Sequence, residues 1–256
     1  MHVGISIMKG IIIDNLTVKY GKRYILKCIS AEFRKGKMYG IIGPNGVGKS
    51  TLLSAITKLI KIETGKVYIN GKDNKKYSIK NLAREISFMS QSFELKFPYT
   101  IEQVVAMGRY PFSEGKLNSE DIVLVEKSLK EANLYDMRQK KINELSGGEK
   151  QRVLFAKTMC QNTDLILIDE GISNADIYYQ IKFIKILKDK VTRENKTVLF
   201  IMHDLTLARK FCDEILILKD GNVYDFGTSK YVLNEKVLYD VFNVKGRFIG
   251  NALEIK

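Results

Sequence analysis

The stretch Gly43-Pro-Asn-Gly-Val-Gly-Lys-Ser50 decides the fold, because it places three glycines, a lysine and a hydroxyl residue in the pattern GxxxxGK[ST]. A strand-like apolar run ends at Ile42, and residues 49–60 have the apolar spacing of a helix. Glycines let successive backbone N–H groups turn toward an anion, and the start of a helix adds its dipole. A glycine-rich turn could match by accident, but the strand–loop–helix context predicts a phosphate-binding loop, or P-loop.

Within this loop, Lys49 is expected to pair with the β- and γ-phosphates of a nucleotide, and the Ser50 hydroxyl to ligate Mg²⁺. Many nucleotide hydrolases share the motif, so it does not define a family by itself. The loop residues predicted to bind nucleotide are Gly43, Pro44, Asn45, Gly46, Val47, Gly48, Lys49, Ser50 and Thr51.

The regions on either side of the P-loop differ in pattern. Residues 11–20, 23–33, 37–42 and 67–70 are predicted to be strands, whereas residues 92–160 are mostly helical, with one long helix expected over 119–132. From residue 165 onward, buried apolar strands alternate with helices, which indicates a mainly parallel sheet. The expected strands are 165–168, 197–202 and 214–218, and the expected helices are 176–192 and 205–211.

These patterns predict an α/β fold: a P-loop NTPase core with a mainly parallel sheet, an N-terminal antiparallel β subdomain and an inserted helical subdomain. We expect one domain over residues 1–256. Its nucleotide-binding core would comprise residues 1–91 and 161–256, and its helical subdomain residues 92–160.

Two carboxylates, Asp169 and Glu170, follow the buried strand Leu165-Ile-Leu-Ile168. In open α/β sheets, ligands bind at the carboxyl ends of strands. There Asp169 could hold hydrated Mg²⁺, and Glu170 could accept a proton from an attacking water. Alone, such a pair is more often a solvated turn, but about 120 residues after a P-loop the catalytic interpretation is favoured.

The stretch Leu145-Ser-Gly-Gly-Glu-Lys-Gln-Arg152 is expected to begin a helix, because Ser146 and Glu149 form an S-x-x-E capping box. The same helix start, with Gly147 and Gly148, suits a γ-phosphate. The stretch resembles the signature LSGGQ or LSGGE of the ATP-binding cassette family. The order of P-loop, signature and Asp-Glu resembles that family over nearly the whole chain.

The resemblance implies roles for four further residues. Tyr20 matches the aromatic side chain that stacks on adenine, and Gln91 the glutamine that touches Mg²⁺ and the attacking water. His203 matches the histidine that holds the γ-phosphate, and Asp176 the last residue of a loop between subunits. The acidic Asp204, next in the chain, favours a functional role for His203. The implied catalytic residues are therefore Glu170, His203 and Gln91, and the implied metal-site residues Ser50, Gln91 and Asp169.

The chain departs from the family after the Asp-Glu pair. The family usually continues DEPTSALD, whereas here Gly171 replaces the proline and Ile172 the threonine. The carboxylates are retained, so hydrolysis is expected. A flexible glycine puts the rigidity of the intersubunit loop in doubt, and with it the coupling efficiency.

One P-loop and one signature imply a homodimer. In this family the signature of one cassette closes on the P-loop of the other, so Ser146, Gly147, Gly148 and Glu149 would act in trans. The implied ligands are ATP and Mg²⁺. ATP binding would close the dimer, and hydrolysis would open it.

The segment Val104-Val-Ala-Met-Gly-Arg-Tyr-Pro-Phe112 resembles ATPases that import iron chelates, haem and cobalamin, and its continuation resembles the catecholate-siderophore branch. The resemblance implies a bacterial importer subunit, peripheral on the cytoplasmic face of the membrane, with permease partners and indirectly a substrate-binding lipoprotein. Aromatic residues near the hinge at Gln91 would suit docking of a permease helix: Phe93, Phe97, Tyr99, Tyr110 and Phe112.

Other classes of cassette protein compete with this interpretation. A soluble iron–sulfur assembly ATPase also has one cassette and is the main alternative. The long coiled coils of a DNA-repair type and the second cassette of a translation factor are not seen in the sequence. Glu170 and His203 argue against a non-hydrolysing regulator.

The bulk composition is that of a globular protein, with 45% hydrophobic and 28% charged residues. Apolar runs are short, so no membrane span of about 20 residues is expected. The net charge of +13 would suit an anionic partner or simply a solvated basic surface; we expect no nucleic-acid partner. The separated Cys28, Cys160 and Cys212 are expected to be reduced packing residues.

Overall fold

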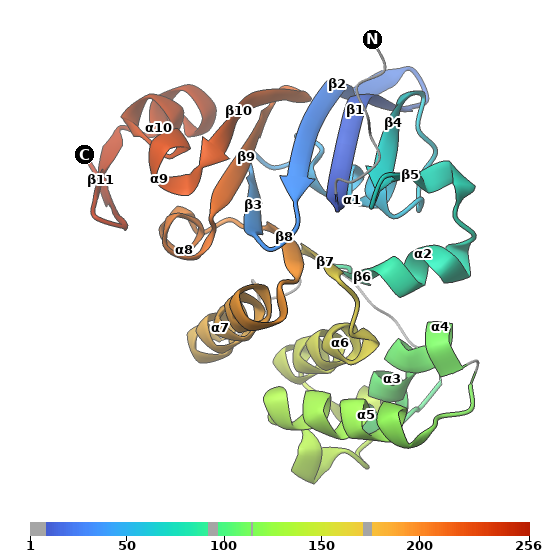
Figure 1. Cartoon of the computed structure of the whole chain (residues 1–256). Helices are drawn as coiled ribbons and strands as arrows, with labels where there is room; N and C mark the ends of the chain where they lie inside the picture. Colours follow the sequence, from blue (N-terminus) through green and yellow to red (C-terminus); the bar gives the residue numbers. More distant parts are fainter. Residues whose placement is uncertain (1–8, 92–96, 114, 171–175) are drawn as a thin grey trace.

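The computed structural model describes residues 9–91, 97–113, 115–170 and 176–256, and Figure 1 shows its arrangement. Its central sheet has six strands in the order β10-β9-β3-β8-β7-β6, and every neighbouring pair is parallel except the antiparallel pair β10 and β9. The predicted mainly parallel sheet is therefore confirmed. Its strands are β3 (Met38–Ile42), β6 (Ile86–Met89), β7 (Leu165–Asp169), β8 (Thr197–Ile201), β9 (Glu214–Lys219) and β10 (Asn222–Thr228).

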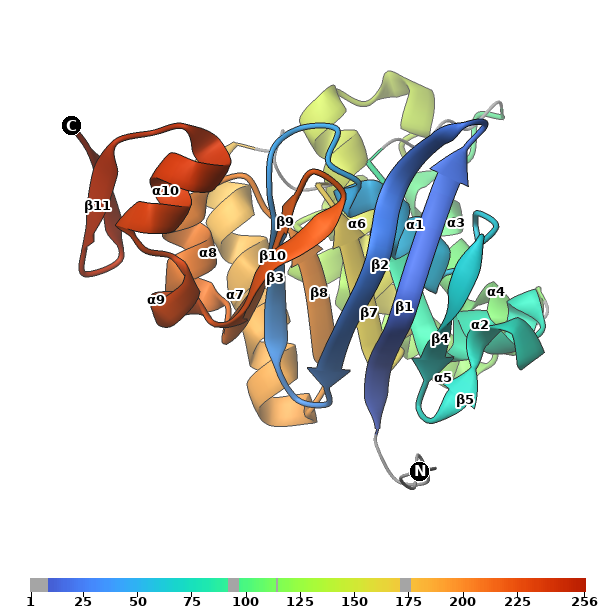
Figure 2. The same cartoon turned by 90° about the horizontal axis from the view of Figure 1, so that it is seen from above.

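A second, antiparallel sheet of four strands confirms the predicted N-terminal β layer. Its order is β2-β1-β4-β5, and β1 and β2 pair as a hairpin around the turn that follows Tyr20. Figure 2 shows this sheet in front of the parallel one. The strands are β1 (Gly10–Tyr20), β2 (Arg23–Arg34), β4 (Thr64–Ile69) and β5 (Lys72–Asp73).

Strand alternation divides the interior into two apolar cores. Successive side chains of a strand point to opposite faces. Met38 and Ile42 of β3 accordingly enter a core shared with the helices, whereas Tyr39 and Ile41 enter a core shared with the antiparallel sheet and α1 (Lys49–Ile56). The same alternation runs through β7, β8 and β9, so the strand ends that carry polar residues are held from both faces.

Helices cover the remaining faces of the parallel sheet. Those between β6 and β7 gather on one side of the molecule, away from the antiparallel sheet (Figure 1), and their apolar side chains belong to the first of the two cores. These helices are α3 (Ile101–Ala106), α4 (Tyr110–Ser113), α5 (Ser119–Glu131) and α6 (Gly147–Gln161); the others are α2 (Ile79–Glu85), α7 (Ile177–Glu194), α8 (Leu205–Phe211), α9 (Ser229–Val232) and α10 (Glu235–Phe242).

Several boundaries differ from those predicted. The helix expected over residues 49–60 ends at Ile56, because Lys58 takes a left-handed conformation with φ 61° and the Thr57 hydroxyl bonds to the Leu53 carbonyl. The strands β6 and β10 and the helix α2 were not predicted. Neither was the C-terminal unit of α9, α10 and the hairpin β11 (Gly246–Ile249) and β12 (Ala252–Ile255).

Among the described residues, no helix is both long and apolar enough to cross a membrane. Of the three cysteines, Cys160 and Cys212 are buried, and burial raises the pKa of each thiol to about 12. Cys28 differs from the prediction, since it is exposed and is not a core packing residue.

Candidate active site

The P-loop joins β3 to α1 through backbone conformations that favour glycine. Gly43 has φ 150°, and a Cβ there would lie 2.3 Å from the Leu218 carbonyl oxygen of the neighbouring strand. Gly48 has φ 111° and caps the start of α1, where a Cβ would meet the Leu26 side chain at 2.6 Å. The glycines thus let the loop pass close to two neighbours and turn into the helix.

Lys49 is held inside this loop, with 4% of its surface exposed. Its Nζ donates to the carbonyl oxygens of Gly43 at 2.8 Å and Pro44 at 3.1 Å. Burial lowers the pKa of the ammonium, while Glu170 and Asp169 act in the opposite direction. The lysine is therefore positioned in the loop by the loop's own backbone.

Ser50 and Asp169 meet although 119 residues separate them. The Ser50 hydroxyl donates to Asp169 Oδ1 at 2.8 Å, at the carboxyl end of β7. Burial raises the pKa of Asp169, the Ser50 hydrogen bond lowers it and Glu170 raises it further. A hydroxyl and a carboxylate oxygen are ligands that Mg²⁺ prefers, so these donors fit the predicted metal site.

Glu170 lies between His203 and Gln91. His203 Nε2 is 2.7 Å from Glu170 Oε1, and Gln91 Nε2 donates to Glu170 Oε2 at 3.1 Å. Glu170 has φ 52°, a left-handed conformation that is uncommon for residues other than glycine and typical of functional sites. The three side chains follow the ends of β7, β8 and β6, which lie side by side in the sheet.

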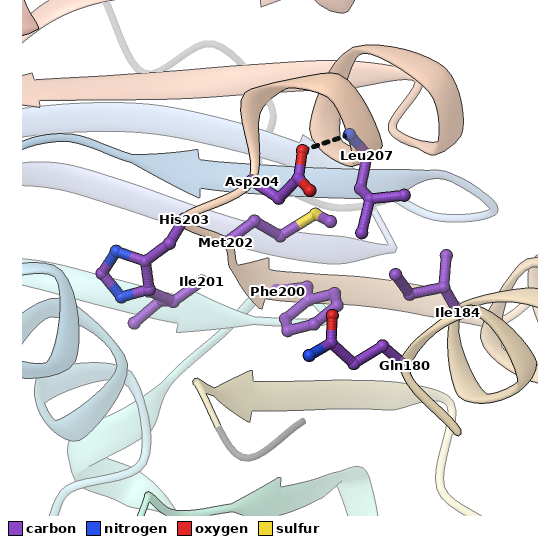
Figure 3. Close-up of a pocket in the computed structure, with 8 residues that line it drawn as sticks. All are labelled: Gln180, Ile184, Phe200, Ile201, Met202, His203, Asp204 and Leu207. Carbon is purple, nitrogen blue, oxygen red and sulfur yellow. Dashed lines mark hydrogen bonds between the residues drawn. The ribbon is translucent and has the colours of Figure 1, made fainter. Parts of the chain in front are cut away.

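The close-up of His203 separates it from its neighbour Asp204 (Figure 3). The Asp204 carboxylate accepts from the Leu207 backbone N–H at 2.9 Å and caps α8. The sequence favoured a functional His203 partly because Asp204 follows it. In the structure the group that contacts the imidazole is Glu170, and Asp204 has a helix-capping role.

The predicted nucleotide residues line a cleft of about 490 Å³. Its opening includes Tyr20, which is half exposed. Ile25, at the start of β2, also lines the cleft and was missed, because an apolar strand residue carries no chemical signal. Thr51 lines the cleft, whereas Gly43, Pro44 and Val47 do not, and Pro44 and Val47 line a neighbouring pocket. The lining residues are Tyr20, Ile25, Asn45, Gly46, Gly48, Lys49, Ser50, Thr51, Gln91, Glu170 and His203.

The signature stands apart from this cleft. Ser146 caps α6: its Oγ accepts from the Glu149 N–H at 3.3 Å, and its own N–H donates to Glu149 Oε2 at 2.8 Å. The predicted capping box is therefore confirmed. A Cβ added to Gly147 or Gly148 would meet no described atom within 4 Å, apart from its own helix backbone and chain neighbours. None of the four signature residues, all of them described, lines the cleft.

Asp176 also caps a helix, since its carboxylate accepts from the Tyr179 N–H at 3.1 Å at the start of α7. Gly171 and Ile172, where the chain departs from the family pattern, lie outside the described residues. Their effect on the intersubunit loop stays a prediction.

Comparison with known proteins places these features in one family. The model of the ABC transporter family matches residues 26–173, which is more than half of the chain. The chain is 34% identical to the petrobactin import ATP-binding protein YclP of Bacillus subtilis, over 91% of this chain and 92% of the relative. It is 32% identical to the iron(3+)-hydroxamate import ATP-binding protein FhuC of the same organism, over 94% of this chain and 91% of the relative. This protein belongs to the ABC transporter family.

Solved structures agree in fold. A chain of a structure described as an inward-facing metal-chelate type ABC transporter has a TM-score of 0.80 and 25% identity, over 96% of this chain and 95% of its own length. A dimeric ATP-binding cassette in a post-hydrolysis state with ADP and phosphate has a TM-score of 0.76 and 31% identity, over 86% of this chain and 98% of its own length. The fold is that of the ABC ATPases.

Proposed function

We propose that this chain is the ATP-hydrolysing subunit of an importer that carries iron–siderophore complexes into the cell. The observation that carries the proposal is the cleft that brings the P-loop together with Glu170 and His203, and whose Ser50 is hydrogen-bonded to Asp169. The import proteins named above support the transport direction and the iron-chelate cargo.

In the proposed reaction, Lys49 and the P-loop N–H groups hold the phosphates of ATP. Mg²⁺, when bound by Ser50 and Asp169 with Gln91 nearby, would neutralise charge on the phosphate oxygens. Glu170 accepts a proton from the attacking water, and Gln91 orients the carboxylate that does so. His203 Nε2 contacts Glu170 in the structure, and once ATP is bound its N–H would turn to the γ-phosphate and leave Glu170 free to accept the proton.

We further propose that two copies form the complete enzyme. Ser146, Gly147, Gly148 and Glu149 lie outside the cleft of their own chain, so they are available to a nucleotide held by a partner. A related cassette with ADP and phosphate is a dimer. Asp176, at the start of α7, would end the loop that passes between the subunits.

A permease would dock on the exposed aromatic residues near α3 and α4. Phe97 is 65% exposed and Tyr110 66% exposed, and Phe112 lies beside Tyr110 in α4. Tyr99 packs partly against the core, so it supports this surface more than it forms it. Phe93 lies outside the described residues. The peripheral location on the cytoplasmic face, the substrate-binding lipoprotein, the lack of a nucleic-acid partner and the catecholate cargo remain proposals.

Two experiments test the proposal. Phosphate release by the purified chain should require Mg²⁺ and ATP, and should fall in Glu170→Gln. In cells, deletion should abolish growth on ferric siderophore as the sole iron source, and the wild-type gene should restore it where Glu170→Gln does not. Growth that persists without a redundant transporter contradicts importer function. Co-purification with iron–sulfur assembly proteins, in place of a permease, would favour the assembly ATPase.

A further inference from the structure

A buried ionic cluster ties the segment after α3 to the end of α6. Arg109 is 8% exposed and Asp121 2% exposed, and Arg109 Nε donates to Asp121 Oδ1 at 2.7 Å. Burial by itself would raise the pKa of Asp121, but hydrogen bonds from Arg109 and from the Asn118 N–H hold it below its usual range. The pair is therefore ionised. Removing one partner would leave the other charge buried and unpaired, which strongly destabilises a protein.

The same guanidinium also caps the C-terminus of α6. Arg109 Nη1 donates to the carbonyl oxygens of Gln161 at 2.8 Å and Cys160 at 3.3 Å. These carbonyls belong to the last turn, where a helix has no internal donors left and carries partial negative charge. Gly108 brings the two segments together, since a Cβ there would lie 2.4 Å from the Lys157 carbonyl oxygen of α6.

The last turn of α6 is attached to α2 as well. Gln161 Nε2 donates to the carbonyl oxygens of Ala83 at 2.6 Å and Ile86 at 2.9 Å. From α2, Arg84 Nε reaches back to the Pro111 carbonyl oxygen at 2.8 Å. The end of α6, the end of α2 and the segment of residues 107–113 are thus joined by directional bonds, and not by apolar packing alone.

The exposed aromatic residues Tyr110 and Phe112 lie beside this cluster. The Arg109 guanidinium lies 4.2 Å from the centre of the Phe112 ring, and Tyr110 beside it is largely exposed. The opposite end of α6 begins after Ser146. A helix of 15 residues spans about 22 Å, so one rigid element connects the aromatic surface to the signature.

We propose that Arg109 is a positioning residue for ATP hydrolysis: by holding the last turn of α6 to residues 107–113, it fixes the position of Ser146 at the other end of the helix. The inference rests on the proposed function, in which Ser146 completes the site of a partner subunit. Arg109 touches neither nucleotide nor reacting atoms, so it acts only through α6.

The first test uses full-length protein carrying Glu170→Gln, which should form an ATP-bound dimer. Adding Arg109→Met should raise the dimer dissociation constant by ~10-fold or more, the usual scale of coupling between sites. Affinity of the monomer for a fluorescent ATP analogue should stay within about 2-fold, because the cleft is remote. Arg109→Lys keeps the charge but not the forked donor, so its dimer dissociation constant should lie between those of the parent and of Arg109→Met.

A second readout follows the position of α6 in the monomer. Spin labels on the exposed Cys28 and on a cysteine introduced at the exposed Lys150 report the distance from the core to the start of α6. The distribution should broaden in Arg109→Met. It should stay narrow in Val125→Ala, which opens the core of α5 without removing any hydrogen bond to α6.

The double variant Arg109→Met with Asp121→Leu guards against simple misfolding, because an apolar pair can replace a buried ion pair. It should fold, yet it still lacks the donors to α6 and should still dimerise weakly. A folded Arg109→Met that dimerises normally with a narrow distance distribution overturns the inference. Equal loss in Val125→Ala, or weakened ATP binding by the monomer, also overturns it. If the Glu170→Gln parent fails to dimerise, the composite site is wrong, and the distance measurement alone decides the role of Arg109.

Discussion

The nucleotide cleft and the signature differ in how much of their structure one chain supplies. In the cleft, Lys49 is held by two carbonyls, and Ser50 meets Asp169 across the sheet. At the signature, Ser146 is exposed, and the hydrogen bonds of its side chain to described residues stay within its own capping box. The first region is organised before any ligand arrives, whereas the second is prepared to meet a group from outside. Under the proposed function, nucleotide binding would need one chain and hydrolysis two.

The largest effect on the rate of hydrolysis is expected for Ser146→Arg. A bulky cation at an exposed helix start should block closure on the partner's nucleotide and lower hydrolysis by ~10³-fold or more, the scale of losing transition-state contacts. Phosphate release measures the loss, and ATP titration of the monomer should remain normal. Asn234→Arg is the matched control, because it removes the cap of α10 and touches neither the signature nor the Arg109–Asp121 pair. A folded Ser146→Arg monomer that cannot bind ATP would show that the signature acts in cis.

Glu170→Gln should slow hydrolysis by at least ~10²-fold, the usual contribution of a positioned general base. The amide keeps the size of the side chain and can still contact His203 and Gln91, so ATP binding should persist. Size-exclusion chromatography should then show an ATP-dependent dimer. Near-normal turnover would assign the base to another group.

Lys49→Ala tests whether one chain by itself binds the nucleotide. Loss of a charged donor to the phosphates should weaken nucleotide affinity by roughly 10- to 100-fold, as for other hydrogen bonds to charged groups. Equilibrium titration with a fluorescent ATP analogue measures it. Lys150→Ala, an exposed lysine in the signature helix, is the control and should bind as the wild type does. Unchanged affinity in Lys49→Ala would refute the role given to the P-loop lysine.

The smallest effect is expected for Asp204→Ala. Loss of the cap of α8 should cost about 1 kcal/mol, and Tm should fall by about 2–4 °C in a protein of this size. Hydrolysis should be nearly unchanged, because the Asp204 carboxylate is engaged by α8 and the imidazole of His203 by Glu170. His203→Ala should instead lower hydrolysis with little change in Tm. Loss of activity in a stable Asp204→Ala protein would show that Asp204 has a role in catalysis beyond capping α8.

Local features were predictable to different degrees. The P-loop and the capping box of Ser146 follow from neighbouring residues, since each depends on backbone conformation and hydrogen bonds within a few positions. The strands β6 and β10 were missed because a short or half-exposed strand has a weak pattern, and its pairing with distant strands stabilises it. The early end of α1 depended on one left-handed residue, Lys58, that no apolar spacing marks.

The sequence by itself determined which chemical groups this protein carries and the local shapes that present them: a glycine loop, a capped signature helix and strands that end in carboxylates. Tertiary structure decided which of these groups meet. The order of strands in the sheet places Glu170 between His203 and Gln91. Packing of α6 against the Arg109 segment joins the two ends of the helical region. Local bonds are fixed by adjacent residues, whereas contacts between distant residues exist only once the whole core has formed.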